Sequence, residues 1–514
     1  MFNKQICVLL IWILTCTSGM AQTIEVNNTR ELELKIREAQ PGTTFSLSRG
    51  EYKDIQLIVE QSGTEENPVV IKAKQPGQVV FCGDVKVELK GDHITLSGIY
   101  FRDGARDAKE WRSHGPGLVA IYGSYNRVTQ CAFHCFDTAN SAYVTTSVRE
   151  DGTFPTHCRI DHCSFTEKIT FDQVINLNNT AKADKTPGAK AAGPMYHRID
   201  HCFFANPKKP GNAGGGIRIG YWRKDDGRCL VDSNLFMRQD SEPEIITSKS
   251  RENVYYANTF LNCRGTLNFR HGDKQVAINN FFIGDDTKYE YGGMFVWGSE
   301  HLIAANYFEL PTTIKSRGNA ALYLNPGARA SEHALAFNIS ICNNTFGPVN
   351  GHAIHFQPLT DRRMETCSAK QLKFEYPSDI RLYSNAFAKT TGEYTLFKND
   401  DLEKNALQWS GNISTTKNFG MSVKDGIMVC KKGKVHKQPY VVYEKGGTFD
   451  IPGIPEYVFM KANSFIDNKP LTFEEVGPHW LTEIPGTYAQ TGKLSKDVQQ
   501  RFKEVISKRT NKKR

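Results

Sequence analysis

A short pattern recurs ten times along the chain and constrains its fold more than any other feature. Each copy is a run of apolar or β-branched residues, then a small or polar residue, any residue and a phenylalanine, as in RVTQCAF ending at Phe133. The phenylalanines lie 22 to 41 residues apart: Phe101, Phe133, Phe165, Phe204, Phe236, Phe260, Phe282, Phe308, Phe346 and Phe387. Repeats of this length indicate stacked units that share one continuous core. Because each unit resembles a short strand and a turn, the pattern predicts an all-β parallel β-helix, a solenoid with a long groove suited to a polymer.

The residue two positions before each phenylalanine changes character along the chain. It is Ile99, Cys131, Cys163 and Cys202 in the first four copies and asparagine in the other six. If the coils stack in register, these side chains form one inward ladder, in which asparagine amides hydrogen-bond to one another. Eleven of the 13 cysteines follow residue 21, an odd number that cannot all pair. We therefore expect free thiols in the core, where cysteine acts as a small hydrophobe.

Residues 1–21 have the features of an export signal. Lys4 supplies the positive end, CVLLIWIL the apolar stretch, and Gly19, Met20 and Ala21 a cleavage site of small residues. No other apolar run approaches the roughly 20 residues that a membrane-spanning helix needs. The sequence thus predicts an exported protein, periplasmic or secreted, without a membrane span.

The rest of the chain divides into two parts. Asn28 and Glu31 open a short predicted helix that caps the first coil. We expect a catalytic β-helix over 22–420 and a smaller region over 421–514 that packs on it and ends in a basic tail. The net charge of +9 suits an anionic partner. An exported chain without a binding motif is not expected to bind nucleic acid, and capped solenoid ends favour a monomer.

Functional residues concentrate between Asn212 and His271. Counted from the preceding repeat phenylalanine, Asn212 and Glu244 both lie at +8, Arg270 at +10 and Lys249 at +13, on consecutive coils. If the coils are in register, these groups gather on one face of three adjacent turns.

Glu242 and Glu244 are two residues apart, so on an extended strand both carboxylates point to the same side. Two such carboxylates repel each other unless a positive group lies between them. A hard cation such as calcium, with Asn212 adding an amide oxygen, is one solution. Ion pairs with Arg218, Arg238 or Lys249 are the other, and the spacing alone does not choose between the two.

Lys249 and Arg270 raise the question of why cations gather near a cation site. An anionic ligand would explain them. A free lysine titrates near about 10.4, so a general base active near neutrality needs a drop of about 3 pKa units. Burial and positive neighbours supply such a drop. A basic groove without a catalytic role is the alternative.

Long strings give the chain a resemblance to polysaccharide lyase family six, and within it to the dermatan sulfate lyases. They are SHGPGLVAIYGSYNR (113–127), HCRIDHCSFTEKITFDQVINLNNTA (157–181), KPGNAGGGIRIGY (209–221), CLVDSNLFMRQDSEPEIITSKS (229–250), GGMFVWGS (292–299) and TIKSRGNAALYLNPGARASEHALAF (313–337). The likeness covers about residues 45–370 and resumes weakly at 476–489.

The resemblance implies a right-handed parallel β-helix and calcium-dependent β-elimination. Carried over residue by residue, it implies a calcium site, a catalytic group and substrate contacts. The calcium ligands are Asn212, Glu242 and Glu244; the catalytic group is Lys249 as base, Arg270 near the leaving oxygen and Glu332 in support; the substrate contacts are His271, Arg317, Arg363, Trp297 and His114. Pro243 between the two glutamates departs from the family pattern, and Lys182 falls in a variable segment.

Three functions fit these observations. The first is cleavage of dermatan sulfate next to iduronate, an anionic glycosaminoglycan that suits Arg317 and Arg363. The second is the same chemistry on alginate, since the family resemblance implies both activities. The third is a non-catalytic β-helix that binds glycans.

Overall fold

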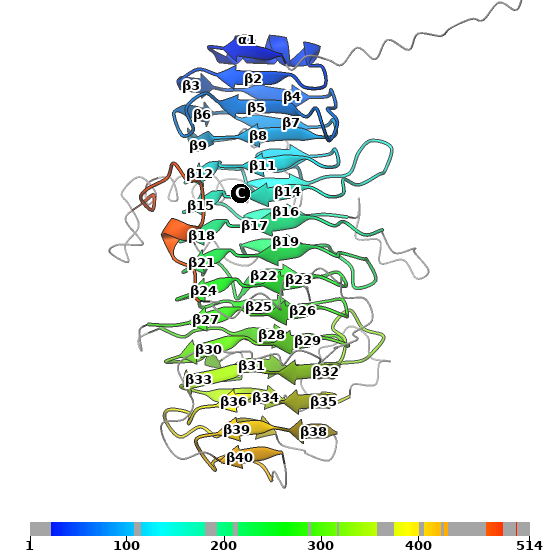
Figure 1. Ribbon diagram of the computed structural model, residues 1–514, viewed down its shortest axis with the longest axis vertical. Helices are drawn as coiled ribbons and strands as arrows, with labels where there is room; N and C mark the ends of the chain where they lie inside the picture. Colours follow the sequence, from blue (N-terminus) through cyan, green and yellow to red (C-terminus); the bar gives the residue numbers. More distant parts are fainter. Residues whose placement is uncertain are drawn as a thin grey trace, which may run out of the picture.

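The computed structural model describes residues 22–106, 115–179, 193–208, 214–285, 289–315, 318–356, 375–399, 406–422, 426–429, 469–486 and 500. Three long parallel sheets wind into one solenoid, a right-handed parallel β-helix, as the repeats predict (Figure 1). Each strand pairs with its counterpart one turn earlier and one turn later. None of the helices in the described residues is long and apolar enough to cross a membrane.

Two sheets, A and B, hold fourteen described strands each, and sheet C holds twelve. The strands of sheet A are β1 (Thr23–Val26), β2 (Thr44–Leu47), β5 (Val69–Ala73), β8 (Ile94–Ser97), β11 (Arg127–Thr129), β14 (Arg159–Asp161), β17 (Arg198–Asp200), β20 (Leu230–Asp232), β23 (Val254–Tyr256), β26 (Val276–Ile278), β29 (Leu302–Ala304), β32 (Phe337–Cys342), β35 (Ser378–Tyr383) and β38 (Leu407–Ser410). Those of sheet B are β3 (Gly50–Lys53), β6 (Val79–Gly83), β9 (Ile99–Gly104), β12 (Ala132–His134), β15 (Ser164–Thr166), β18 (Phe203–Ala205), β21 (Leu235–Met237), β24 (Thr259–Leu261), β27 (Phe281–Ile283), β30 (Tyr307–Leu310), β33 (Thr345–Val349), β36 (Ala386–Phe387), β39 (Asn412–Ser414) and β40 (Ile427–Val429). Those of sheet C are β4 (Gln56–Val59), β7 (Lys86–Leu89), β10 (Val119–Ile121), β13 (Val144–Thr146), β16 (Ile175–Leu177), β19 (Ile217–Ile219), β22 (Glu244–Ser248), β25 (Thr266–Phe269), β28 (Met294–Val296), β31 (Ala320–Leu324), β34 (His352–Phe356) and β37 (Phe397–Asn399).

The repeat phenylalanines form a continuous stack inside sheet B. Phe133 pairs in register with Phe101 and Phe165, and the same pairing continues to Phe387. Successive ring centroids lie between 4.4 Å (Phe101 to Phe133) and 5.1 Å (Phe165 to Phe204) apart. Adjacent strands are about 4.8 Å apart, so rings on successive turns meet at a favourable stacking distance. The register predicted from the sequence is confirmed.

The predicted asparagine ladder is also present, and it continues to Asn412. The side-chain amide of Asn258 donates to Asn280 Oδ1 (3.0 Å) and to the Val231 carbonyl (2.8 Å), and its own Oδ1 accepts from Asn234. The same pattern repeats on the following turns, so each buried amide is satisfied by the next coil. The cysteines of the earlier turns are buried and free, as are all nine cysteines in the described part of the chain.

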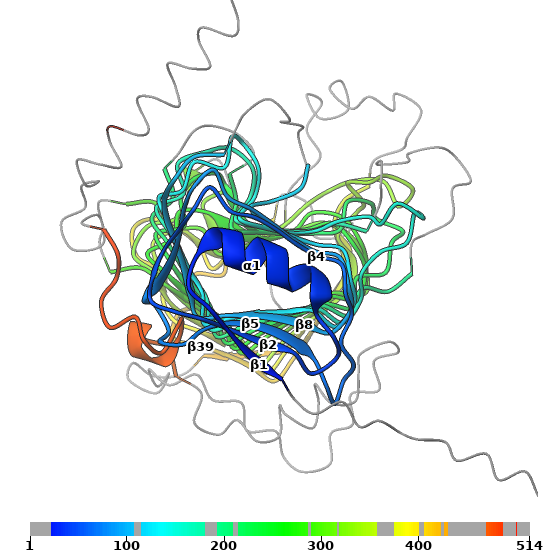
Figure 2. The same cartoon turned by 90° about the horizontal axis from the view of Figure 1, so that it is seen from above.

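A short helix covers one end of the solenoid, as expected. In α1 (Thr29–Lys35) the Asn28 side chain caps the first turn by accepting from the Glu31 amide (3.0 Å). Leu32 is buried against the first coil, and a 3₁₀ turn, η1 (Ile36–Glu38), follows. Seen from above, α1 lies across the opening enclosed by the three sheets (Figure 2). The helix therefore covers apolar core that would otherwise meet water.

Residues 469–486, which include η4 (Phe473–Glu475), pack on the outer face of sheet B (Figure 1, orange). Phe473 meets Phe203 edge-on at 4.9 Å, and the Leu471 amide donates to Thr259 Oγ1 (2.8 Å). Farther along, the indole of Trp480 donates to the Gln130 carbonyl (2.7 Å). This segment lies on a different sheet from the candidate site.

Candidate active site

Lys249, Arg270 and Trp297 occupy the same position on three consecutive turns. Each directly follows a strand of sheet C, namely β22, β25 or β28. The amides of Lys249 and Arg270 continue the ladder by donating to the carbonyls of Ile219 (2.8 Å) and Ser248 (2.9 Å). We call this line of residues that directly follow the sheet C strands the edge column. The prediction that Lys249 and Arg270 gather on adjacent turns is therefore confirmed.

A β-bulge brings Glu244 to the outer face of sheet C. Glu244 pairs with Thr266 and Ile246 with Leu267, so Ile245 is an extra residue in β22. Ile245 and Ile246 both point into the core. In a regular strand Glu244, two residues before Ile246, would point inward as well; the extra residue turns it outward. Its Oε2 accepts from the Thr247 hydroxyl (2.9 Å) on that face.

The prediction that Glu242 and Glu244 lie on one extended strand, with both carboxylates on the same side, is wrong, because Glu242 lies in a bend before β22. Glu242 instead accepts from the Gly214 amide (3.1 Å). Glu244 forms an ion pair with Arg270. That partner differs from the three basic residues considered above, because the bulge sets Glu244 beside the following turn. Both carboxylates are buried, at 7% and 8% exposure.

The donors around Glu242 and Glu244 suit a hard cation. Gly215 approaches Glu242 so closely that an added Cβ would lie 3.0 Å from its Oε1. Gln173 lies beside Gly215 and Gln239 beside Gly216. The Oε1 atom of each glutamine is buried and lacks a hydrogen-bond partner among the described residues. No three His, Cys, Asp or Glu side chains converge within those residues. A calcium ion here would thus need amide, backbone, water or substrate oxygens besides Glu242 and Glu244.

Lys249 lies in a positive, largely desolvated environment. Its Nζ is 5.2 Å from the centre of the Tyr221 ring, and the buried Arg218 lies 5.6 Å from the same ring. Burial, followed by the charges of Arg218 and Arg270, lowers the pKa of Lys249 to about 8. About one tenth of Lys249 is therefore neutral at pH 7, in the form that a general base requires.

His271 and Glu332 form the wall next to Arg270. The pKa of His271 is held well below its usual value by burial, with further contributions from His333, Lys249 and Arg270. Its Nδ1 lies 3.8 Å from Glu332. Glu332 accepts from the Trp222 indole (2.6 Å) and from the Arg223 amide (3.1 Å). This geometry makes Glu332 a positioning residue behind His271.

Trp297, expected to stack on a sugar ring, is enclosed in this structure. It is 8% exposed and packs with Phe295 and Tyr323. Its ring centroid lies 4.9 Å from that of His333, which in turn meets His271 edge-on at 5.0 Å. Trp297 thus supports the wall formed by His333 and His271.

Five residues near the site were not assigned from sequence: Arg218, Tyr221, Trp222, Arg223 and His333. Their position in the sequence could have indicated them. Arg218, Tyr221 and His333 lie inside the strings GIRIGY and SEHALAF, and Trp222 and Arg223 directly follow GIRIGY. By contrast, four predicted site residues lie outside the described residues, as does the predicted export signal 1–21. They are Asn212, His114, Arg317 and Arg363. Lys182 and the basic tail also lie outside.

Comparison with known proteins places the fold among the polysaccharide lyases. The chain matches the PL6 family alginate lyase AlyGC over 90% of its own length and 59% of that chain, with 22% identity and a TM-score of 0.68. It therefore spans about three fifths of that enzyme. A PL6 family polysaccharide lyase from Pseudopedobacter saltans matches at 18% identity and a TM-score of 0.62, over 89% of this chain and 99% of that one.

A mannuronic acid specific family 6 lyase from human gut microbiota matches at 19% identity and a TM-score of 0.62, covering 95% of this chain and all of that one. No curated protein matches the chain. At these identities the solved structures establish the fold, a parallel β-helix of the PL6 lyase type. The family follows from the sequence profile of chondroitinase B, which matches residues 26–452. The chain belongs to the chondroitinase B family.

Proposed function

We propose that this protein is an exported polysaccharide lyase that cleaves dermatan sulfate next to iduronate by calcium-assisted β-elimination. The observation that carries the proposal is the placement of Lys249 and Arg270 on adjacent turns beside two buried carboxylates. The family match over residues 26–452 supports the lyase chemistry. The same features argue against a purely glycan-binding protein, which needs neither a lysine of lowered pKa nor a paired arginine.

In the proposed reaction neutral Lys249 removes the proton next to the carboxylate of the uronate ring. Electrons of that C–H bond form a carbon–carbon double bond, and the bond to the glycosidic oxygen breaks. The products are an unsaturated uronate at the new non-reducing end and a shortened chain. The buried surroundings that keep Lys249 partly neutral also exclude water from the transfer.

Arg270 lies where it can stabilise charge on the leaving oxygen. Arginine keeps its proton at any working pH, so we assign it electrostatic stabilisation, with water supplying the proton to the leaving group. Its ion pair with Glu244 fixes the guanidinium beside Lys249. His271, neutral and backed by Glu332, lies next to Arg270 as a hydrogen-bonding group for the substrate.

Calcium would be held by Glu242 and Glu244, with Asn212 as a further ligand. When bound, it neutralises the uronate carboxylate and thereby makes the neighbouring proton more acidic. The chain's own contribution is the desolvated carboxylate pair, whose charge is partly offset by the ion pair of Glu244 with Arg270.

Two anionic polysaccharides, dermatan sulfate and alginate, are the candidate substrates. The chondroitinase B profile favours dermatan sulfate. Several solved proteins of the same fold are described as alginate lyases, which keeps alginate as the second candidate. Initial rates on dermatan sulfate and alginate, measured in parallel with the full-length protein, decide between them. Faster cleavage of alginate would make alginate the preferred substrate and would leave the proposed β-elimination unchanged.

A further inference from the structure

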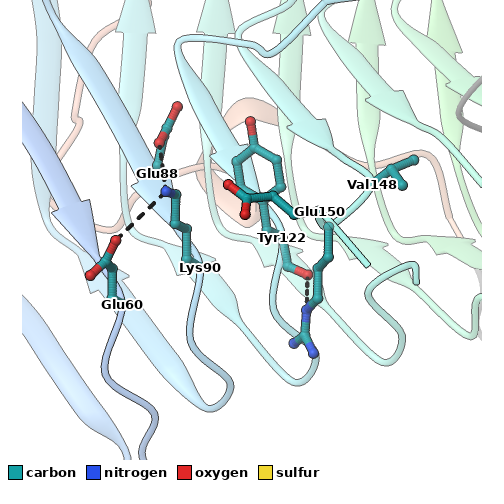
Figure 3. Close-up of a pocket in the computed structure, with 7 residues that line it drawn as sticks. Glu60, Glu88, Lys90, Tyr122, Val148 and Glu150 are labelled. Atoms are coloured by element: carbon teal, nitrogen blue, oxygen red, sulfur yellow. Dashed lines mark hydrogen bonds and ion pairs between the residues drawn. The ribbon is translucent and has the colours of Figure 1, made fainter. Parts of the chain in front are cut away.

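A cavity opens on the outer face of sheet C, several turns away from Lys249. Figure 3 shows the residues that line it. Its volume is about 520 Å³. The residues that line it come from the ends of three successive strands and from the loop after β13: Glu60, Glu88, Lys90, Tyr122, Val148, Arg149 and Glu150. None of them takes part in the chemistry proposed above.

This cavity lies on the edge column that contains the candidate catalytic pair. Lys90 directly follows β7 and Tyr122 directly follows β10, as Lys249 follows β22. Their amides donate to the carbonyls of Val59 and Leu89 (2.8 Å each), which is the bond that Lys249 makes to Ile219. Four turns separate Tyr122 from Lys249, or about 19 Å at a strand spacing of about 4.8 Å. A polymer that follows the column from Lys249 would reach the cavity.

The basic groups of the cavity already have anionic partners. Lys90 Nζ lies 3.7 Å from Glu60 and 3.8 Å from Glu88, and Lys86 pairs with Glu88 at 3.0 Å. Arg149 pairs with Asp92 and donates to the Tyr122 carbonyl (2.8 Å). Figure 3 shows Lys90 directed toward both glutamates.

A sulfate or carboxylate that entered the cavity would therefore face Glu60, Glu88 and Glu150 without a free cation to receive it. Sugar hydroxyls, by contrast, can donate to carboxylate oxygens and accept from lysine or arginine. The half-buried Tyr122 adds an aromatic side chain, a group that suits the apolar face of a sugar ring. The lining thus favours an uncharged ring face over an anion.

We propose that this cavity is a distal subsite that binds the uncharged, hydroxyl-bearing face of a hexosamine ring in a long substrate chain. The inference rests on the proposed function for the identity of the polymer. It adds a reason for specificity. Every ring of alginate carries a carboxylate, whereas a glycosaminoglycan alternates uronates with hexosamines, which can present an uncharged face to the cavity while their sulfate points away from it.

The test is equilibrium binding, measured by calorimetry in the Lys249→Ala background so that the chain stays intact. Long dermatan sulfate chains are compared with a dermatan sulfate tetrasaccharide, which, when bound across the scissile bond, places two rings on each side of Lys249 and does not reach Tyr122. Loss of one stacking or hydrogen-bonding contact corresponds to about fivefold in affinity. We expect Tyr122→Ala to weaken binding of long chains by about that factor and to leave tetrasaccharide binding within about twofold.

Two further variants make the result specific. Glu150→Gln changes an exposed lining residue without a foreseeable effect on folding and is expected to weaken long-chain binding in the same direction. Tyr125→Ala is the matched control, because Tyr125 is 51% exposed on the same turn as Tyr122 and stacks instead with His93 and His157. Tyr125→Ala in the Lys249→Ala background should bind long chains as tightly as Lys249→Ala alone.

Equal losses for long and short chains in Tyr122→Ala, or no loss for either, would overturn the subsite. So would a Tyr122-dependent affinity for alginate as large as that for dermatan sulfate. The cleavage rate of the wild-type protein is a separate readout. A protein that binds long chains through Tyr122 and cleaves none would overturn the proposed lyase function and keep the subsite.

Discussion

Arg270 forms an ion pair with Glu244 of the preceding turn, and the β-bulge at Ile245 makes this contact possible. One carboxylate thereby touches the candidate catalytic arginine and belongs to the candidate calcium site. The two functions are coupled, because a change at Glu244 alters both the position of Arg270 and the charge available to a cation.

Glu244→Gln should impair both functions at once. The neutral amide holds a hard cation less well and no longer pairs with Arg270. We expect calcium affinity, measured by calorimetry, to fall at least about tenfold and kcat/KM to fall about 100-fold, the size typical of lost transition-state positioning. Glu252→Gln is the matched control, since Glu252 is also 8% exposed and paired with an arginine, Arg228 (2.6 Å), away from the site. Unchanged calcium affinity in Glu244→Gln would remove Glu244 from the ligand set.

The pH dependence follows from the environment of Lys249. A base must be unprotonated, and burial with the charges of Arg218 and Arg270 lowers the pKa of Lys249 to about 8. We expect kcat/KM to rise with pH, to bend near pH 8 and to become level above it, since this parameter reports the free enzyme. Lys249→Ala should lose this limb together with about 10²- to 10⁴-fold in rate. A profile that falls between pH 7 and 9 would contradict the role of Lys249 as base.

The asparagine ladder predicts a measurable stability contribution. Asn258→Ala removes side-chain hydrogen bonds to Asn280 and Val231 and an acceptor for Asn234. Because the unpaired groups stay buried, we expect the free energy of unfolding to fall by about 2–4 kcal/mol in denaturant titrations. Asn67→Ala, at an exposed position, should stay within about 0.5 kcal/mol. Equal stability of the two variants would mean that the ladder is not stabilising.

The fold could be predicted from the sequence because each coil repeats a local signal. The phenylalanine spacing predicts the stack, and the asparagines predict the ladder, even where intervals vary from 22 to 41 residues. The candidate site could be predicted from the sequence only in part. Lys249 and Arg270 occupy equivalent positions at different offsets, +13 and +10, because loop length and the bulge change the count between turns.

The pair of Glu244 with Arg270 could not be inferred, because one inserted residue decides which way Glu244 points. Nor does the sequence place Arg218 and Tyr221 around Lys249. Those contacts depend on how consecutive turns stack in three dimensions. The cavity around Tyr122 is hidden for the same reason, since its lining residues are scattered between Glu60 and Glu150.

The most direct test of the account is the ultraviolet absorbance of an unsaturated uronate during incubation with dermatan sulfate, with calcium and with a chelator. The account predicts a steady rise with calcium, little or none with the chelator, recovery on adding calcium back, and a rise at least about 100-fold slower for Lys249→Ala. Chain cleavage without a rise in absorbance, or a rise that Lys249→Ala or the chelator leaves intact, would contradict it.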